Sequence, residues 1–203
     1  MYIPPHFAQT DQAKLHDAIE RYSFALLVSG SGDDLVASHL PLLLKRDEGP
    51  WGTLVGHMAR ANPQWQSAAG QPVLAVFSGP HAYISPTWYA SERVVPTWNY
   101  VAVHAYGRLE LIDDEAATLE LLHRTVERYE ASQPRPWRLA DQPAEFIAGL
   151  ARQIVAFQLP IERLEGKWKL SQNHPGERRE RVIEALAGQG GDAEEIARLI
   201  ARA

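Results

Sequence analysis

The stretch Asn99 to Leu111, NYVAVHAYGRLEL, decides the fold class. Its even-numbered and odd-numbered positions are both largely apolar, which is typical of a β-strand covered on two sides. Segments of similar strand character precede it at residues 23–29, 35–44, 51–57 and 73–77, and another is expected around 156–164. The Gly- and Asp-rich turn at 30–34 joins the first two into a hairpin. Because strands follow strands without a βαβ alternation, the sequence predicts an antiparallel barrel rather than a Rossmann sheet.

Helical periodicity appears before, after and within this run of strands. Thr10 or Asp11 is suited to cap a first helix, whose apolar face carries Leu15, Ile19 and Tyr22. Past Asp113 the period again becomes helical, and two inserted helices are expected at about 115–155. One face of the first carries Leu119, Leu122, Val126 and Tyr129. In the second, after a cap at Asp141, the residues expected inward are Phe146, Ile147, Leu150 and Ile154.

Two further helical stretches, at 177–187 and 192–201, are joined by a Gly-rich segment. We therefore expect an α+β chain with two parts. Residues 1–174 form the barrel domain with peripheral helices, and residues 175–203 form a two-helix C-terminal tail.

Composition restricts the possible chemistry. The 203 residues include 20 Lys+Arg, 25 Asp+Glu and no Cys, with a formal net charge of −5. The absence of Cys excludes disulfides, thiol nucleophiles, thiolate zinc sites and iron–sulfur clusters. The acidic balance argues against a generally basic, nucleic-acid-coating surface, although a local basic patch stays open. The N-terminus has no basic stretch followed by an apolar run, and we expect a cytoplasmic protein.

Several common motifs are missing from the sequence. It contains no GxxxxGK[ST], no GxGxxG and no HExxH. The corresponding nucleoside-triphosphate, dinucleotide and zinc-hydrolase classes are therefore unsupported.

Dense polar and aromatic segments at predicted strand ends remain as candidate sites. Ser38 and His39 interrupt an apolar strand, so they either have buried partners or face a ligand. In the segment 56–65, GHMARANPQW, His57 and Arg60 beside a helix start make an anion pocket, or alternatively a capped helix with a solvated Arg. Two Pro-Thr-Trp triplets, at 86–88 and 96–98, offer flat walls for a planar ligand or cover the barrel end. The segment 167–173, KWKLSQN, joins two cations to an aromatic ring and amides.

These segments resemble one known family when they are taken together. MYIPPHF, SHLPLLL, GHMARANPQW, VFSGPHAYISPTWY, VPTWNYVAVHAYGRL and KWKLSQN occur in that order over about residues 1–187. They are similar to the FMN-binding negative transcriptional regulators, the PaiB-like proteins. The resemblance implies a flavin-reductase-like split β-barrel, a homodimer with FMN at the subunit interface, and a role as a repressor of protease and sporulation genes.

The resemblance also implies positions for the cofactor. Ser38 and His39 look like the strand positions beside the flavin ring, and His57, Arg60 and Asn62 look like the phosphate-side group. Further contacts are expected near the ring, at the interface or closing the site, from Trp98, Asn99, Lys169, Gln172 and Asn173. Catalytic residues are not assigned, and no metal site is expected.

Three functions stay open at this point. The first is an FMN-binding, flavin-dependent sensor or transcriptional regulator, and the second is a small FMN-dependent oxidoreductase of split-barrel type. The third is a haem-binding split barrel with His39, His57 or His104 as axial ligand. DNA is weakly supported as a partner, because residues 175–203 contain five Arg and six Asp+Glu and neither tail helix carries a basic stripe.

Overall fold

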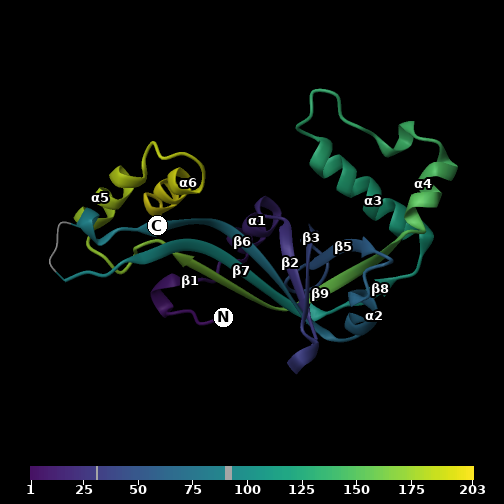
Figure 1. Cartoon of the computed structure of the whole chain (residues 1–203), viewed down its shortest axis with the longest axis horizontal. Helices are drawn as coiled ribbons and strands as arrows, with labels where there is room; N and C mark the ends of the chain where they lie inside the picture. The colour runs from purple at the N-terminus through teal and green to yellow at the C-terminus, as the bar shows by residue number, and fades with distance from the viewer. Residues whose placement is uncertain (31, 90–92) are drawn as a thin grey trace. The chain divides into compact units, whose positions relative to one another are not determined.

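A computed structural model describes residues 1–30, 32–89 and 93–203 (Figure 1). These residues form six α-helices and nine strands, and a short 3-10 helix, η3 (Pro86–Tyr89), also lies near the candidate site. The helices are α1 (Gln12–Arg21), α2 (Gln64–Ala68), α3 (Glu115–Glu130), α4 (Ala144–Ala151), α5 (Gly176–Leu186) and α6 (Gly191–Ile200). The strands are β1 (Ala8–Gln9), β2 (Phe24–Ser29), β3 (Val36–Pro41), β4 (Leu43–Lys45), β5 (Thr53–Ala59), β6 (Pro72–Ile84), β7 (Thr97–Arg108), β8 (Glu110–Ile112) and β9 (Ile154–Lys169).

The strands form one sheet in the order β3-β2-β6-β7-β9-β5-β4, with β1 and β8 also pairing with β9. The pairs β2–β3, β2–β6, β4–β5, β5–β9, β8–β9 and β1–β9 are all antiparallel. The predicted hairpin is present, with Leu26 opposite His39. Its predicted turn includes Ser31, which lies outside the described residues.

The single strand expected at 35–44 is two strands, and that prediction was wrong. β3 ends at Pro41, which has no N–H to continue a ladder, and the Leu42 N–H donates to the Ser23 carbonyl at 2.9 Å. From Leu43 the chain pairs with β5 instead. The β3 strand therefore stays at the sheet edge, where Ser38 and His39 lie.

The chain divides into two compact units. Unit 1 comprises Met1–Ala18, Phe77–His104 and Glu165–Ala203, and unit 2 comprises Ile19–Val76 and Ala105–Leu164. The strands β6, β7 and β9 each contribute residues to both units. The predicted boundary between residues 174 and 175 stays a prediction.

Unit 1 contains the two tail helices. In Figure 1, α5 and α6 lie side by side near the ends of β6 and β7 that belong to this unit. Arg179 of α5 donates to the carbonyls of Ile200 (2.6 Å) and Ala203 (2.7 Å), so it satisfies carbonyl groups at the C-terminal end of α6. The two helices are thus held together by a specific polar contact.

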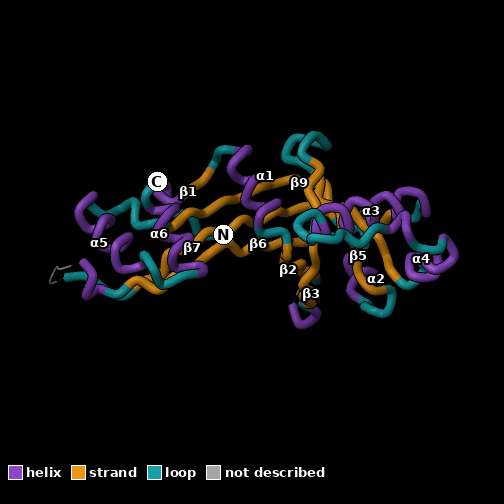
Figure 2. Tube along the Cα trace, turned by 90° about the horizontal axis from the view of Figure 1, so that it is seen from above, coloured by secondary structure: helices purple, strands orange, loops and turns teal. Residues whose placement is uncertain are grey.

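Unit 2 contains a small core under α3. Leu121 of α3 packs with Val55 and Ala156, and Asp114 caps the helix by accepting from the Ala117 N–H at 2.7 Å. Figure 2 shows α3 and α4 of this unit and the strands that run beside them. Nearby, Gly107 is required because an added Cβ would lie 2.2 Å from the Pro160 carbonyl oxygen.

The predicted inward face of α4 is wrong for three of its four residues. Ile147 is buried, but Phe146 and Leu150 are 52% and 49% exposed. Ile154 is not helical and begins β9. Because α4 has only eight residues, one buried face holds few side chains, and the other apolar residues of the helix stay exposed.

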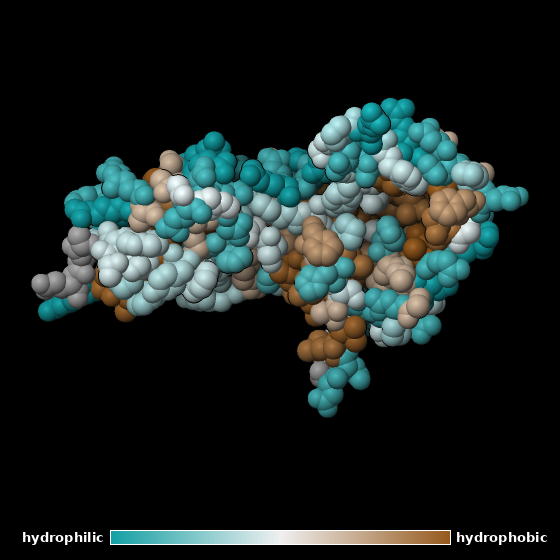
Figure 3. Space-filling view, turned by 45° about the horizontal axis from the view of Figure 1, so that its top comes forward, coloured by the Kyte–Doolittle hydropathy of each residue, from teal (hydrophilic) through white to brown (hydrophobic). Residues whose placement is uncertain are grey.

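The described helices include none long and apolar enough to cross a membrane. Apolar surface is nevertheless exposed at the end of the β2–β3 hairpin, where Figure 3 shows brown atoms. Leu35 and Val36 contribute to it, with 63% and 40% of their surface exposed.

Candidate functional site

The segment that follows β5 in unit 2 forms a polar network, in which the Gln64 Oε1 atom alone among the described atoms of that side chain has no partner. The Asn62 side chain donates to the Ser38 hydroxyl at 2.9 Å and accepts from the Gln64 N–H at 3.0 Å. The buried Gln64 amide donates to the carbonyls of Leu27 (3.1 Å) and Val36 (3.3 Å) and to a serine hydroxyl of β2. Ser38 and Asn62, predicted separately, are therefore in contact, and Gln64 fastens the hairpin beneath them.

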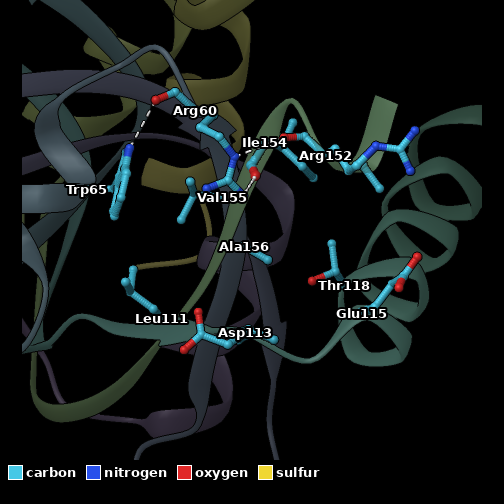
Figure 4. Close-up of a pocket in the computed structure, with 12 residues that line it drawn as sticks. Arg60, Trp65, Leu111, Asp113, Glu115, Thr118, Arg152, Ile154, Val155 and Ala156 are labelled. Atoms are coloured by element: carbon cyan, nitrogen blue, oxygen red, sulfur yellow. Dashed lines mark hydrogen bonds between the residues drawn. The ribbon is translucent and has the colours of Figure 1, made fainter. Parts of the chain in front are cut away.

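Arg60 is tied to the backbone of the neighbouring strand. Its Nε donates to the Arg152 carbonyl at 2.9 Å and its Nη2 to the Ile154 carbonyl at 2.7 Å (Figure 4). The Trp65 indole N–H in turn donates to the Arg60 carbonyl at 3.1 Å. These residues line a cavity of about 380 Å³ that also carries Asp113 and Glu115. Because the Arg60 guanidinium already donates to two carbonyls and lines a cavity with two carboxylates, it is poorly suited to bind a phosphate.

The two predicted histidines of unit 2 differ in environment. His57 lies on β5 opposite Ala156, and burial lowers the pKa of its imidazole. It is therefore neutral at pH 7 and offers a hydrogen bond rather than a charge. His39 is exposed on β3 and stacks on Phe24, with ring centroids 5.9 Å apart.

Unit 1 contains a different kind of site, which we call the Tyr89 cavity. It has a volume of about 340 Å³ and is formed by η3, the start of β7, the end of β9 and the start of α5. Four of its described lining residues are basic, namely Arg93, Lys169, His174 and Arg178, and none is acidic. Thr97, Asn99, Ser171 and Asn173 supply neutral polar groups.

The Tyr89 hydroxyl is buried, and the residue is 3% exposed. Among the described residues no group lies in good hydrogen-bonding geometry to its oxygen, although the Ser171 hydroxyl is close enough to interact with it. Burial raises the pKa of this phenol, against smaller opposing effects of Ser171 and Arg178. An unsatisfied buried hydroxyl costs about 1–3 kcal/mol, so this group is available to a ligand at a net gain.

Lys169 is a cation without a carboxylate. Among the described residues its ammonium donates to the Thr97 hydroxyl and forms no ion pair. Its pKa is lowered mainly by burial and further by Lys167, against the opposing effect of Tyr100. Lys167 itself donates to the Tyr2 carbonyl at 3.0 Å. The partners described for these two lysines of β9 are thus neutral groups.

The segment from Ser171 to α5 completes the wall. Ser171 has a positive φ of 62° and its hydroxyl accepts from the Asn99 amide at 2.8 Å. The His174 ring lies 4.9 Å from the Tyr89 ring. Burial lowers the pKa of His174, and Arg178 and Lys169 lower it further. The structure therefore brings the predicted residues Asn99, Lys169 and Asn173 together around a positively charged hollow.

The remaining two predicted residues of unit 1 do not line the cavity. Gln172 accepts from the Leu170 N–H and donates to the Trp168 carbonyl, both at 2.7 Å, so its side chain holds the turn. Trp98 is 52% exposed and packs edge-on against Tyr83 at 5.8 Å. His81 lies 6.0 Å from the same indole. Of the aromatic residues expected in a loop, Tyr83 and Trp98 thus lie on β6 and β7, whereas Trp88 and Tyr89 lie in η3.

The sequence interpretation missed Tyr89, Ser171, His174 and Arg178 as site residues. Arg178 was counted only in the charge of the tail, and Tyr89 only as the end of an aromatic loop. His174 directly follows the KWKLSQN segment, so its position at the end of a polar strand was the one available signal.

Residues 1–163 match the family model described as "Putative FMN-binding domain". The chain is 36% identical to the protease synthase and sporulation protein PAI 2 of Bacillus subtilis, over 98% of this chain and 96% of that protein. It is 30% identical to the uncharacterised protein AN0679 of Emericella nidulans, over 95% of this chain and 93% of that protein.

Solved structures give the fold. The flavocytochrome Anf3 of Azotobacter vinelandii has a TM-score of 0.59 at 17% identity, covering 82% of this chain and 72% of that one. The FAD and heme binding protein of Mycobacterium smegmatis has a TM-score of 0.57 at 16% identity, covering 91% and 82%. The antiparallel split barrel with peripheral helices that the sequence predicted is confirmed. The chain belongs to the family of FMN-binding domains related to PAI 2, and FMN is its cofactor.

Proposed function

We propose that the protein is an FMN-dependent sensor that acts in the cytoplasm as a homodimer and represses transcription of target genes. The regulatory part is supported by the 36% identity to PAI 2 along almost the whole chain, since that protein is named for protease synthesis and sporulation. The flavin part is supported by the chemistry of the described side chains.

The observation that carries the flavin part is the set of groups in unit 1. FMN needs a flat apolar wall, hydrogen-bonding groups at the ring edges and positive charge for its phosphate. Unit 1 offers Asn99 and Asn173 as amides and Lys169, which forms no ion pair with another described residue, as a cation, all at the Tyr89 cavity, and it exposes the rings of Trp98 and Tyr83 outside that cavity. The residues present fit the cofactor, which when bound supplies electron and hydride transfer.

The predicted residues of unit 2 take different roles in this proposal. For Ser38, His39, His57 and Asn62, the contacts with the flavin ring and its phosphate side that the resemblance implies stay a prediction. Arg60 is a positioning residue, because its guanidinium fixes the end of β5 against the start of β9. In unit 1, Gln172 positions the turn that carries Ser171 and Asn173.

Exposed apolar side chains support a homodimer. Odd-numbered residues of β7 from Asn99 to Gly107 are buried, whereas Tyr100, Ala102, His104 and Tyr106 are only partly covered and Trp98 is exposed. A second copy packed on this face would bury the even-numbered residues, as the strand pattern predicts. The measurement is the molar mass in solution by light scattering, and a monomer at micromolar concentration would overturn this part.

The cofactor is tested on the purified protein. We expect flavin absorption bands and, after removal of flavin, recovery of one FMN per chain on reconstitution. A Soret band in place of flavin bands would identify a haem protein instead.

The same preparation separates a regulator from an oxidoreductase. We expect slow or no bleaching of bound FMN by NADH or NADPH under anaerobic conditions. Rapid bleaching with turnover on an electron acceptor would overturn the sensor proposal in favour of an FMN-dependent oxidoreductase.

Direct DNA binding is the part of the proposal that depends on the C-terminal tail. Each arginine of α5 already has a role within unit 1. Arg178 lines the cavity, Arg179 caps α6, and Arg181 pairs with Glu177 at 2.8 Å. Sequence-specific mobility shifts that persist at moderate salt would support repression through direct DNA binding, and their absence would require a protein partner for the output.

A further inference from the structure

The cavity of about 380 Å³ beside Arg60 in unit 2, which we call the Leu111 cavity, combines an apolar lining with charged side chains (Figure 4). Ligand pockets of small molecules have volumes of this order. The Trp65 ring contributes to the wall while its N–H donates to the Arg60 carbonyl. The aliphatic lining residues come from β8, α4 and the start of β9, namely Leu111, Ile112, Ala151, Ile154, Val155 and Ala156.

The charged residues of the Leu111 cavity are two acidic and two basic ones, Asp113, Glu115, Arg60 and Arg152. The Arg60 guanidinium already donates to two main-chain carbonyls. The side chains of the other three form no hydrogen bond or ion pair with another described residue. In Figure 4, Asp113 and Arg152 lie on opposite sides of Ala156. The cavity therefore offers negative charge at one end and positive charge at the other.

The edge of β8 adds main-chain groups to this cavity. Leu111 lies opposite Phe157, and β9 is the one described strand that pairs with β8. Two residues earlier, the Leu109 N–H donates to the Gln71 carbonyl at 3.2 Å and the Leu109 carbonyl accepts from the Gly70 N–H at 2.7 Å, both away from β9. Because alternate residues of a strand direct these groups to the same edge, those of Leu111 lie at the open edge of β8. An extended peptide adds to such an edge through main-chain hydrogen bonds.

We propose that the Leu111 cavity binds a short peptide that has apolar side chains and free ends. The apolar lining takes the side chains and the edge of β8 takes the main chain. Asp113 and Glu115 face the ammonium end, and Arg152 faces the carboxylate end. Opposite charges at the two ends of an apolar cavity favour a zwitterion over an amine, an acid or an uncharged molecule. The proposal goes beyond the FMN-dependent sensor, to which it adds a second ligand.

Trileucine is the probe, and equilibrium dialysis against the FMN-bound protein measures its binding directly. We expect trileucine to bind at least about tenfold more tightly than triglycine, which has the same main chain and end charges but no apolar side chains. Absence of trileucine binding at millimolar concentration, or equal binding of the two peptides, would overturn the proposal.

Blocking one end of trileucine identifies the charge that this end contacts. N-acetylation should weaken binding to the wild type about two- to fivefold, the range of an exposed ion pair, and should have no effect on the double variant Asp113→Asn/Glu115→Gln. C-terminal amidation should likewise weaken binding to the wild type but not to Arg152→Gln. Glu120→Gln and Arg138→Gln are the matched controls, because both side chains are exposed and lie outside the cavity. If blocking an end weakens binding equally in the wild type and in these variants, the proposal is wrong.

The variants are expected to fold, because the substituted side chains are exposed. The charges of Asp113 and Glu115 also suit the start of α3, so the stability of each variant without peptide is measured by urea denaturation. If a variant does not fold, the wild type still decides, since acetylation and amidation must each weaken binding to it.

FMN is the last control. Trileucine should bind equally with and without FMN, because Arg60, the predicted phosphate-side residue that lines the cavity, has its donors at the carbonyls of Arg152 and Ile154. Displacement of FMN by trileucine would place the flavin in this cavity and overturn the proposal. Because the flavin-free protein is also tested, failure of FMN binding and failure of the peptide site are separate results.

Discussion

The segment after β5 in unit 2 and the Tyr89 cavity in unit 1 contain similar residue types but satisfy them differently. In unit 2 the Asn62 amide contacts Ser38, and the Arg60 guanidinium contacts two backbone carbonyls. In unit 1 the Lys169 ammonium donates to a threonine hydroxyl, and the buried Tyr89 hydroxyl lies beside Ser171 at the wall of a cavity. The first network stabilises the fold, whereas the second leaves donors for a ligand.

This difference shows why residue type alone did not distinguish the segment after β5 from the Tyr89 cavity. From the sequence, Arg60 was predicted to bind the phosphate, because an arginine beside a helix start is typical of anion sites. The structure shows the Arg60 donors used by the carbonyls of Arg152 and Ile154, whereas Lys169, on a strand, donates to a threonine hydroxyl and lines a cavity. Whether a charge is available depends on its partners, and those come from distant parts of the chain.

The largest effect is expected where the hydrogen bonds of the buried Gln64 amide are broken. Gln64→Glu places a carboxylate against the carbonyls of Leu27 and Val36, and we expect a loss of about 3–5 kcal/mol in unfolding free energy at alkaline pH. The control is Gln66→Glu, on the exposed side of the same helix, which should stay within about 0.5 kcal/mol of wild type. Urea denaturation measures both, and equal stability of the two variants would contradict the structural role of Gln64.

The next effect is on binding, in the other unit. Lys169→Met removes the ammonium and keeps most of the aliphatic chain. We expect FMN and phosphate affinity to fall by about 1.5–3 kcal/mol, roughly ten- to a hundred-fold. Stability should not fall, because no ion pair among the described residues is lost. Calorimetric titration of the flavin-free protein measures the affinity, and a large loss of stability with unchanged affinity would assign Lys169 to the fold instead.

Arg60→Ala distinguishes the two regions most directly. If Arg60 holds β5 against β9, the unfolding free energy falls by about 1–2 kcal/mol, less than for a buried network because the side chain is exposed. FMN affinity should then change less than about threefold. A tenfold or greater loss of FMN affinity at unchanged stability would restore the phosphate-side role that the sequence predicts.

The sequence predicted the features that depend on neighbouring residues, and it did not predict those that depend on contacts with distant parts of the chain. Asp11 accepts from the Ala13 and Lys14 N–H groups and the β2–β3 hairpin forms as predicted, because caps and turns depend on neighbouring residues. The break at Pro41 also had a local signal. The exposure of Phe146 and Leu150 had no local signal, because apolar periodicity does not show whether another part of the chain covers that face of the helix.

The candidate site shows the same limit. Asn99 and Lys169 were identified from composition and resemblance, but the Tyr89 cavity requires that η3, β9 and α5 meet. Ser171 lies between β9 and α5 and has a positive φ. This backbone conformation is seen in the structure and has no signal in the sequence.

The smallest effect is a pH dependence that involves one histidine in each region. His57 and His174 both have pKa values below their ordinary 6.5 in the folded protein, mainly through burial. The unfolded chain therefore takes up these protons first. Stability is fully present above pH 6.5 and declines as the pH falls through the unfolded value toward the lower folded values, with a slope of at most about 1.4 kcal/mol per pH unit for each histidine. His57→Gln and His174→Gln should each reduce the slope.

Phosphate then separates the two histidines. Phosphate bound at Lys169, where the proposed function expects the phosphate of FMN, offsets the charges of Arg178 and Lys169, so the pKa of His174 should rise, whereas that of His57, which only burial lowers, should not move. NMR titration of the imidazole protons with and without phosphate measures both in one sample. A parallel rise of the two pKa values would mean that phosphate acts on the whole protein, and the contrast between the segment after β5 and a ligand site would lose its clearest support.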